Sequence, residues 1–127
     1  MRKIGEKIIE KMNEETRGKF SLSVRDAVIS DEQFIKVFLW GNPIFKKNKE
    51  AEKFFFSCCD YDTQTTTTRL NDLLGHFFNA KIFHKNNELF IRLQNGAVEK
   101  INSKSVYQIG MDTITEVIQN NYVTLNY

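Results

Sequence analysis

The sequence predicts an α+β fold in which helices pack against antiparallel sheet. Runs of alternating or continuous apolar residues, typical of strands, recur from Phe20 to Leu93. Two other segments repeat apolar residues at helical spacing. The chain is 41% hydrophobic and 13% aromatic, with eleven Phe but one Pro and six Gly. A chain of 127 residues with this composition can bury one core, so we expect residues 1–127 to form a single domain.

The first expected element is an amphipathic helix from Arg2 to Glu15. Apolar residues recur every four positions at Ile4, Ile8 and Met12, and charged residues cover the other side. Gly18 is the expected stop. We expect this helix to pack on the sheet, although the same spacing also suits a helix that docks into a partner's groove.

Strand patterns follow the helix. Phe20–Arg25 alternates apolar and polar residues, and the strand can extend past Asp26 to Ile29. Gln33–Trp40 is almost continuously apolar, as expected of a central strand buried on both faces. Lys53–Cys59 is aromatic. These runs predict a three-stranded antiparallel meander.

Between the second and third strands lies a basic stretch with Lys46, Lys47 and Lys49. We expect an exposed loop here. Such a charge run is most often solvated surface, and the alternative is contact with a phosphate or an acidic partner.

The spacing predicts a central helix over 66–78. One face carries Leu70, Leu73, Leu74 and Phe77. Threonine is a poor interior helix residue but a good N-cap, so we expect the cap at Thr65 or Thr66. Arg69 is expected on the opposite, wetter face.

At the start of this helix, Thr63, Thr65, Thr66 and Arg69 suggest an anion site. A helix N-terminus offers free N–H groups, and hydroxyls and an arginine add donors. The alternative is that the threonines only cap the helix and bond to the local backbone.

The remaining chain reads mainly as strand. Segments 81–84 and 88–93 form an expected hairpin around Asn86-Asn87, because Asn tolerates positive φ. Segments 97–101 and 105–109 are further expected strands. Segment 111–120 fits either helix or strand, and 123–127 reads weakly as a last strand.

Composition and motifs exclude few functions outright. The net charge of +2 indicates neither a basic nucleic-acid binder nor an acidic mimic of nucleic acid. Cys58 and Cys59 are expected to be buried free thiols. Neither His76 nor His84 has a recognisable catalytic context, so we expect no enzyme activity, no metal and no cofactor. Without a signal peptide or an apolar span, a soluble protein of the bacterial cytoplasm is expected.

The stretch Tyr61-Asp-Thr-Gln-Thr-Thr-Thr-Thr-Arg-Leu-Asn-Asp-Leu-Leu precedes an aromatic hairpin. It resembles a motif in small uncharacterised proteins of phages and other mobile elements of Gram-positive bacteria. That motif has a tyrosine and threonines leading into Arg-Leu-Asn-x-Leu-Leu. The matching residues are Tyr61, Thr63, Thr65, Thr66, Arg69, Leu70, Asn71, Leu73 and Leu74.

The resemblance implies a non-enzymatic binding protein that inhibits a bacterial defence protein, possible targets including a CRISPR RNA-guided nuclease. Because the charge is balanced, occlusion of a protein surface is expected rather than mimicry of DNA. The alternative is a nucleic-acid-binding accessory or regulatory protein. The candidate contact residues are Tyr61, Thr63, Thr65, Thr66, Arg69, Lys46, Lys47 and Lys49.

Overall fold

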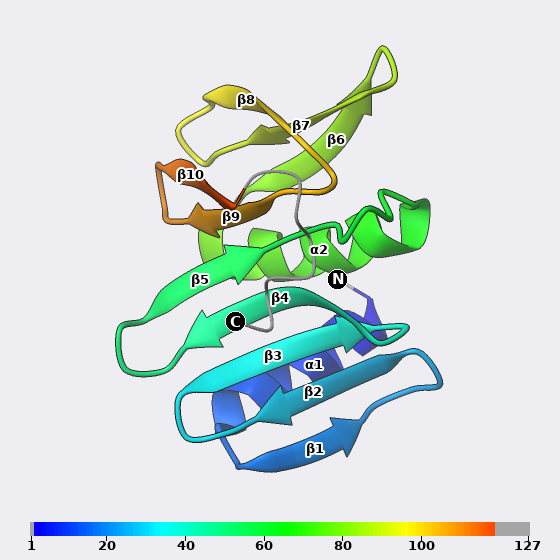
Figure 1. The fold of residues 1–127 in the computed structure, drawn as a ribbon, viewed down its shortest axis with the longest axis vertical. Helices are drawn as coiled ribbons and strands as arrows, with labels where there is room; N and C mark the ends of the chain where they lie inside the picture. Colours follow the sequence, from blue (N-terminus) through cyan, green and yellow to red (C-terminus); the bar gives the residue numbers. More distant parts are fainter. Residues whose placement is uncertain (1, 119–127) are drawn as a thin grey trace.

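The computed structural model describes residues 2–118 and confirms the α+β fold, with two helices and ten strands in antiparallel sheets (Figure 1). The helices are α1 (Lys3–Glu14) and α2 (Gln64–Phe78). The strands are β1 (Gly18–Ser21), β2 (Asp26–Ser30), β3 (Phe34–Leu39), β4 (Asn42–Asn48), β5 (Lys53–Phe56), β6 (Lys81–Lys85), β7 (Glu88–Arg92), β8 (Val98–Ile101), β9 (Val106–Ile109) and β10 (Ile114–Ile118).

The larger sheet has seven strands in the order β1-β2-β3-β4-β5-β9-β10. Its first five strands form a continuous meander, longer than the three-stranded one expected. The smaller sheet has three strands in the order β6-β7-β8. Both helices lie behind the larger sheet in Figure 1, and the smaller sheet lies at one end of the molecule.

One apolar cluster lies between the helices and the sheets. It includes Ile8 and Met12 of α1, Leu70 and Leu73 of α2, and Ile91 of the smaller sheet. The two apolar faces predicted from helical spacing are therefore core faces. Packing on the sheet, the first alternative for α1, is the arrangement observed.

Several boundaries differ from the prediction. Segment 20–29 is a hairpin of β1 and β2 rather than one irregular strand. The helix α1 ends at Glu14, and its C-cap Glu15 is left-handed with φ 53°, so Gly18 is not its stop but begins β1. The segment after Asp112 is strand β10, which removes the helical alternative for its described part. Segment 123–127 lies outside the described residues.

Strand β3 is central as predicted, but only one of its faces is fully buried. Ile35, Val37 and Leu39 are buried toward the helices, whereas Phe34 and Phe38 on the other face are partly exposed. The hairpin of β6 and β7 is confirmed. Asn86 and Asn87 both have positive φ, at 53° and 63°, as its two-residue turn requires.

Candidate functional site

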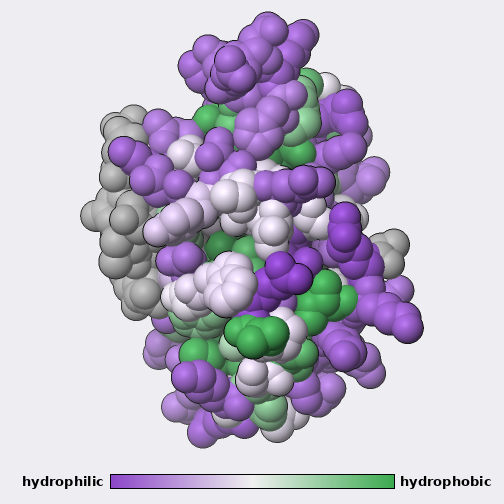
Figure 2. All heavy atoms as spheres, turned by 90° about the vertical axis from the view of Figure 1, so that its right-hand side faces the viewer, coloured by the Kyte–Doolittle hydropathy of each residue, from purple (hydrophilic) through white to green (hydrophobic). Residues whose placement is uncertain are grey.

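Three chain segments meet at one end of the larger sheet, on the right-hand side of Figure 1. They are the β1–β2 turn, the β3–β4 turn and the loop that enters α2. Each exposes one large apolar or aromatic side chain: Val24 is 96% exposed, Trp40 65% and Tyr61 54%. We call this region, with Arg25 and Thr65, the Trp40 surface. Figure 2 shows the face, where green apolar and pale aromatic or hydroxyl residues gather among charged ones.

Trp40 has a backbone conformation that its side chain disfavours. Leu39 pairs with Asn42, so Trp40 and Gly41 form a two-residue hairpin turn, with φ of 50° and 78°. Asn and Gly adopt such angles easily, whereas a bulky residue is an outlier there. The Trp40 N–H donates to the Arg25 carbonyl at 2.8 Å, which ties the two turns together. A strained aromatic residue exposed to solvent indicates a functional position.

Beside Trp40 lies a hollow of about 460 Å³, which we call the apolar hollow. Its floor contains Leu39, Ile44 and Cys58, all buried. Trp40 and Tyr61 also line it. Burial raises the pKa of the Cys58 thiol to about 12, so this group stays protonated and uncharged at neutral pH. The hollow can therefore receive an apolar side chain.

A second hollow of about 170 Å³ adjoins the first, because Thr65 lines both. We call it the arginine hollow. Its other lining residues are Arg2, Arg25, Gln64, Thr68 and Arg69. The lining holds cations and neutral donors but no carboxylate. This arrangement is suited to an anionic group.

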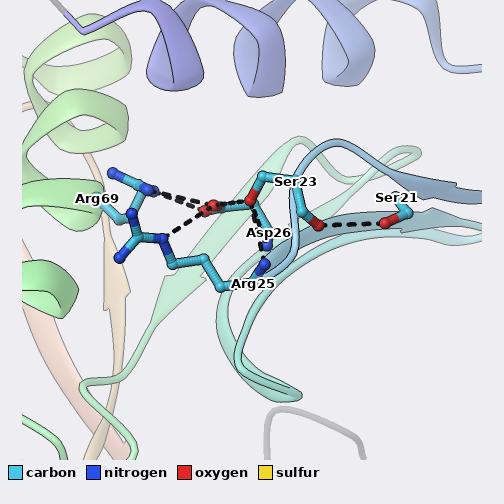
Figure 3. A network of polar contacts seen from close by, with 5 residues as sticks. All are labelled: Ser21, Ser23, Arg25, Asp26 and Arg69. Atoms are coloured by element: carbon cyan, nitrogen blue, oxygen red, sulfur yellow. Dashed lines mark hydrogen bonds and ion pairs between the residues drawn. The ribbon is translucent and has the colours of Figure 1, made fainter.

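Beneath the arginine hollow, a buried ion pair joins α2 to the larger sheet (Figure 3). Arg69 Nε donates to Asp26 Oδ1 at 2.6 Å, and Arg69 Nη2 donates to Asp26 Oδ2 at 3.2 Å. Ser23 Oγ also donates to Asp26 Oδ2, at 2.6 Å, and accepts from the backbone N–H groups of Arg25 and Asp26. The expectation that Arg69 lies on a wet face is therefore wrong: its guanidinium is neutralised by a buried carboxylate.

The threonines mainly shape the start of α2. The N-cap is Thr63, whose Oγ1 accepts from the Thr66 N–H at 3.3 Å, and not Thr65 or Thr66 as expected. Thr67 Oγ1 donates back to the Thr63 carbonyl at 3.1 Å. These are local side-chain-to-backbone bonds of the kind weighed as the alternative to an anion site.

The structure brings together the candidates Tyr61, Thr63, Thr65 and Thr66, which line the apolar hollow. Arg69 lines the neighbouring hollow from below. The lysine candidates are elsewhere, toward the other end of β4.

The expected exposed loop of lysines is wrong, because Lys46 and Lys47 belong to strand β4. Lys46 is buried, with its Nζ 4.3 Å from the centre of the Phe34 ring, and burial lowers its pKa. Lys47 pairs with Glu15 at 3.5 Å, and Lys49 donates to backbone carbonyls. Strands β3 and β5 pair with Lys46 and Lys47 on both sides, but the run of lysines favoured a loop in the sequence.

Sequence reasoning missed Val24, Trp40, Arg2 and Arg25. A usable signal existed for Trp40, since Trp-Gly stands where a tight turn favours Asn-Gly. Nothing local indicates Arg2 or Arg25, because their shared hollow forms only when α1, α2 and the β1–β2 turn come together.

Two searches of the described part, residues 2–118, add negative findings. No helix there is long and apolar enough to cross a membrane. Over the same residues, no group of three or more His, Cys, Asp or Glu side chains could hold a metal ion.

Comparison with known proteins gives one family. Residues 1–123 match the family model described as Kyanoviridae Gp96 protein, a family of phage proteins. No curated protein and no solved structure matches the chain. The expectation of a phage protein is confirmed, whereas inhibition of a defence protein stays a prediction. Because the match spans nearly the whole chain, the protein belongs to the Kyanoviridae Gp96 family.

Proposed function

We propose that this phage protein is a non-enzymatic binding protein that attaches to a bacterial host protein through the Trp40 surface and blocks it by occlusion. The observation that carries the proposal is Trp40 itself, 65% exposed and left-handed at φ 50°. Its strain has no benefit for folding in a turn that Asn would form more easily. A benefit in binding explains it, because Trp, Tyr and Arg dominate the energy of protein interfaces.

The rigidity of the surface also supports binding. The Asp26–Arg69 pair and the Trp40–Arg25 hydrogen bond hold three segments of the chain in place before any partner arrives. A surface that is ordered in advance loses less conformational entropy on binding. The partner that the sequence resemblance suggests is a defence protein inside the host cell, such as a CRISPR RNA-guided nuclease.

A pull-down from host lysate that contains CRISPR effector complexes tests the proposal, with and without digestion of nucleic acid. We expect a stoichiometric complex that survives digestion and moderate salt, and an effector that no longer cleaves its target. Trp40→Ala should abolish the complex. Val98→Ala is the matched control, since Val98 is 50% exposed on β8 in the smaller sheet. Equal capture by both variants would refute the proposed surface.

A second candidate function is binding of single-stranded nucleic acid, favoured by an exposed tryptophan close to Arg25. Bases stack on aromatic side chains, and arginines contact phosphates. The exposed cations that line the hollows of this surface are few, namely Arg2, Arg25 and Lys19. This candidate therefore predicts a shallow dependence of affinity on salt. Titration of a thymidine oligonucleotide at several salt concentrations, followed by the fluorescence of the only tryptophan, tests it.

A further inference from the structure

The apolar hollow and the arginine hollow form one continuous surface. Thr65 lines both, and Arg25 and Trp40 together line a third hollow of about 400 Å³ beside Val24. A single short segment of a partner can therefore reach an apolar floor and a cationic wall at once. The apolar hollow suits an apolar side chain of that segment, and the arginine hollow suits an anionic one.

The charges of the arginine hollow decide what it can receive. Arg69 is satisfied by the Asp26 carboxylate, to which it donates two hydrogen bonds. Arg25 Nε lies 4.0 Å from the same carboxylate and its side chain is 45% exposed. Arg2 forms no ion pair with another residue of the range 2–118. The Asp26 carboxylate pairs with Arg69 and Arg25, and Arg2 lines the same hollow, so the hollow has a local excess of positive charge.

A nearby carboxylate does not remove this excess. Two carboxylates, those of Asp26 and an ionised Asp72, are still outnumbered by three arginines. Asp72 lies close to Arg2 and Arg69, and burial raises the pKa of its carboxyl. It does not line the hollow. The hollow is therefore lined by Arg2 and Arg25 together with the neutral side chains of Gln64 and Thr65.

The number of exposed cations favours a protein carboxylate over a nucleic-acid backbone. A nucleic-acid groove contacts several successive phosphates with a stripe of basic residues. Here the three hollows are lined by three exposed cations, Arg2, Arg25 and Lys19, and the net charge of the chain is +2. One Asp or Glu side chain needs no more than a guanidinium fork and neighbouring hydroxyl or amide donors.

Resting on the proposed function, we infer that the partner presents a short segment in which an apolar side chain lies within a few residues of Asp or Glu. The apolar side chain occupies the hollow between Trp40 and Tyr61. The carboxylate occupies the arginine hollow and pairs with Arg2 and Arg25. Thr65 lies at the junction between the two hollows.

The test is selection from a displayed library of random 12-residue peptides against the whole protein. We expect the selected peptides to share an acidic residue close to a large apolar one. Their binding should quench or shift the fluorescence of Trp40, the only tryptophan in the chain. Replacing the acidic residue of a selected peptide by its amide should weaken binding at least ten-fold.

Variants of the protein locate the contacts. Arg25→Ala should weaken the acidic peptides at least ten-fold, and Arg25→Lys should restore part of the affinity. Arg17→Ala is the matched control, because Arg17 is 69% exposed just before β1, away from the β1–β2 turn, and pairs with Glu32 there. Thermal melting of each variant checks that the fold is unchanged.

The outcomes separate this inference from the proposed function. Peptides without acidic residues, no selected peptide at all, or equal binding by Arg25→Ala would overturn the inference. Tight oligonucleotide binding that displaces the peptides would overturn it in favour of a nucleic acid. If Trp40→Ala loses a captured host protein but Arg25→Ala keeps it, the proposed function stands and the inference fails. If acidic peptides bind but no host protein does, the inferred preference for acidic segments is supported and the proposed blocking of a host protein is refuted.

Discussion

At the scale of single residues, Trp40 and Asn86 occupy the same kind of position with different residue types. Each is the first residue of a two-residue hairpin turn with positive φ. The chain uses Asn-Asn where the turn has only to connect strands, and Trp-Gly where the tip belongs to the Trp40 surface. Comparing the two turns shows that positive φ alone does not require Trp, so the aromatic side chain of Trp40 is attributed to the Trp40 surface.

Trp40→Asn should therefore raise stability while it removes binding. Asn tolerates the left-handed region, and relief of the strain is expected to contribute about 1 kcal/mol to the free energy of unfolding. Urea denaturation measures the gain, and the host-protein pull-down measures the loss. A variant that is less stable than the wild type would show that the Trp40 side chain packs against the fold.

Asp72 is a second residue whose side chain lies in an environment that does not favour the folded state. Gly5 of α1 packs directly on it, since a Cβ at Gly5 would lie 2.5 Å from Asp72 Oδ2. That oxygen is buried and has no hydrogen-bond partner. Desolvation raises the pKa of the Asp72 carboxyl above its ordinary value of 3.8, although Arg2 and Arg69 oppose the shift.

The sign of this shift predicts a pH dependence. The folded protein holds the Asp72 proton more tightly than the unfolded chain, so stability falls as pH rises from about 3.8 through the raised pKa. Asp72→Asn should remove that part of the dependence. In thermal melts, the melting temperature of the variant should rise relative to that of the wild type as pH increases across this window, and it should remain higher at pH 7. A variant that melts lower at pH 7 would contradict the assignment.

Arg69 differs most from its sequence-based interpretation. Its position next to Leu70 on the helix, and its charge, indicated an exposed contact residue. The partner that buries it, Asp26, is 43 residues earlier in the chain, and no local pattern can reveal a pair of that separation.

Arg69→Ala should cost about 3–5 kcal/mol, because it leaves the Asp26 carboxylate buried and unpaired. Chemical denaturation measures the loss. The double variant Asp26→Asn with Arg69→Met should recover part of it, since no buried charge then remains. A loss below about 1 kcal/mol in the single variant would mean that water reaches Asp26.

At the scale of elements, α2 holds the two sheets together. Arg69 bonds to β2, and Asn71 bonds to β6: its Nδ2 donates to the Ile82 carbonyl at 3.0 Å, and its Oδ1 accepts from the Ile82 N–H at 2.7 Å. The Arg-Leu-Asn stretch, residues 69–71, belongs to the motif that resembles other phage proteins. Its two polar side chains thus connect α2 to both sheets, and Leu70 packs in the core.

Leu73→Ala tests the core face of α2. Leu73 is fully buried in the apolar cluster, so its truncation should cost about 2–5 kcal/mol in denaturant unfolding. Gln64→Ala at the exposed start of the same helix is the control and should change stability by less than about 0.5 kcal/mol. Similar losses in both variants would contradict the assigned helix face.

The elements that sequence predicted well are those with a clear period. Both helices and the Asn86-Asn87 hairpin were found because apolar spacing and turn residues agree there. Strand β4 was missed because Lys46 and Lys47 looked like solvated charge, whereas Lys46 is buried among aromatic rings. The Trp40 surface was found only on the α2 side, because its other segments join it through tertiary contacts.

At the scale of the whole molecule, the apolar cluster extends from α1 to the smaller sheet. We propose that the described elements form one cooperative domain. Far-UV circular dichroism and exchange of the Ile82 and Ile91 amides in the smaller sheet should give the same free energy of unfolding. A lower free energy of opening from amide exchange than from circular dichroism would show that the smaller sheet opens separately.

The Trp40 surface is assembled from turns around Val24, Trp40 and Tyr61, and the Asp26–Arg69 pair lies beneath it. No linear stretch of the chain contains it. An antibody raised against this face should recognise the native protein but not the denatured band on a blot. Synthetic fragments copied from any one turn should fail as competitors for the partner. An inhibitor derived from this protein must therefore keep the whole fold.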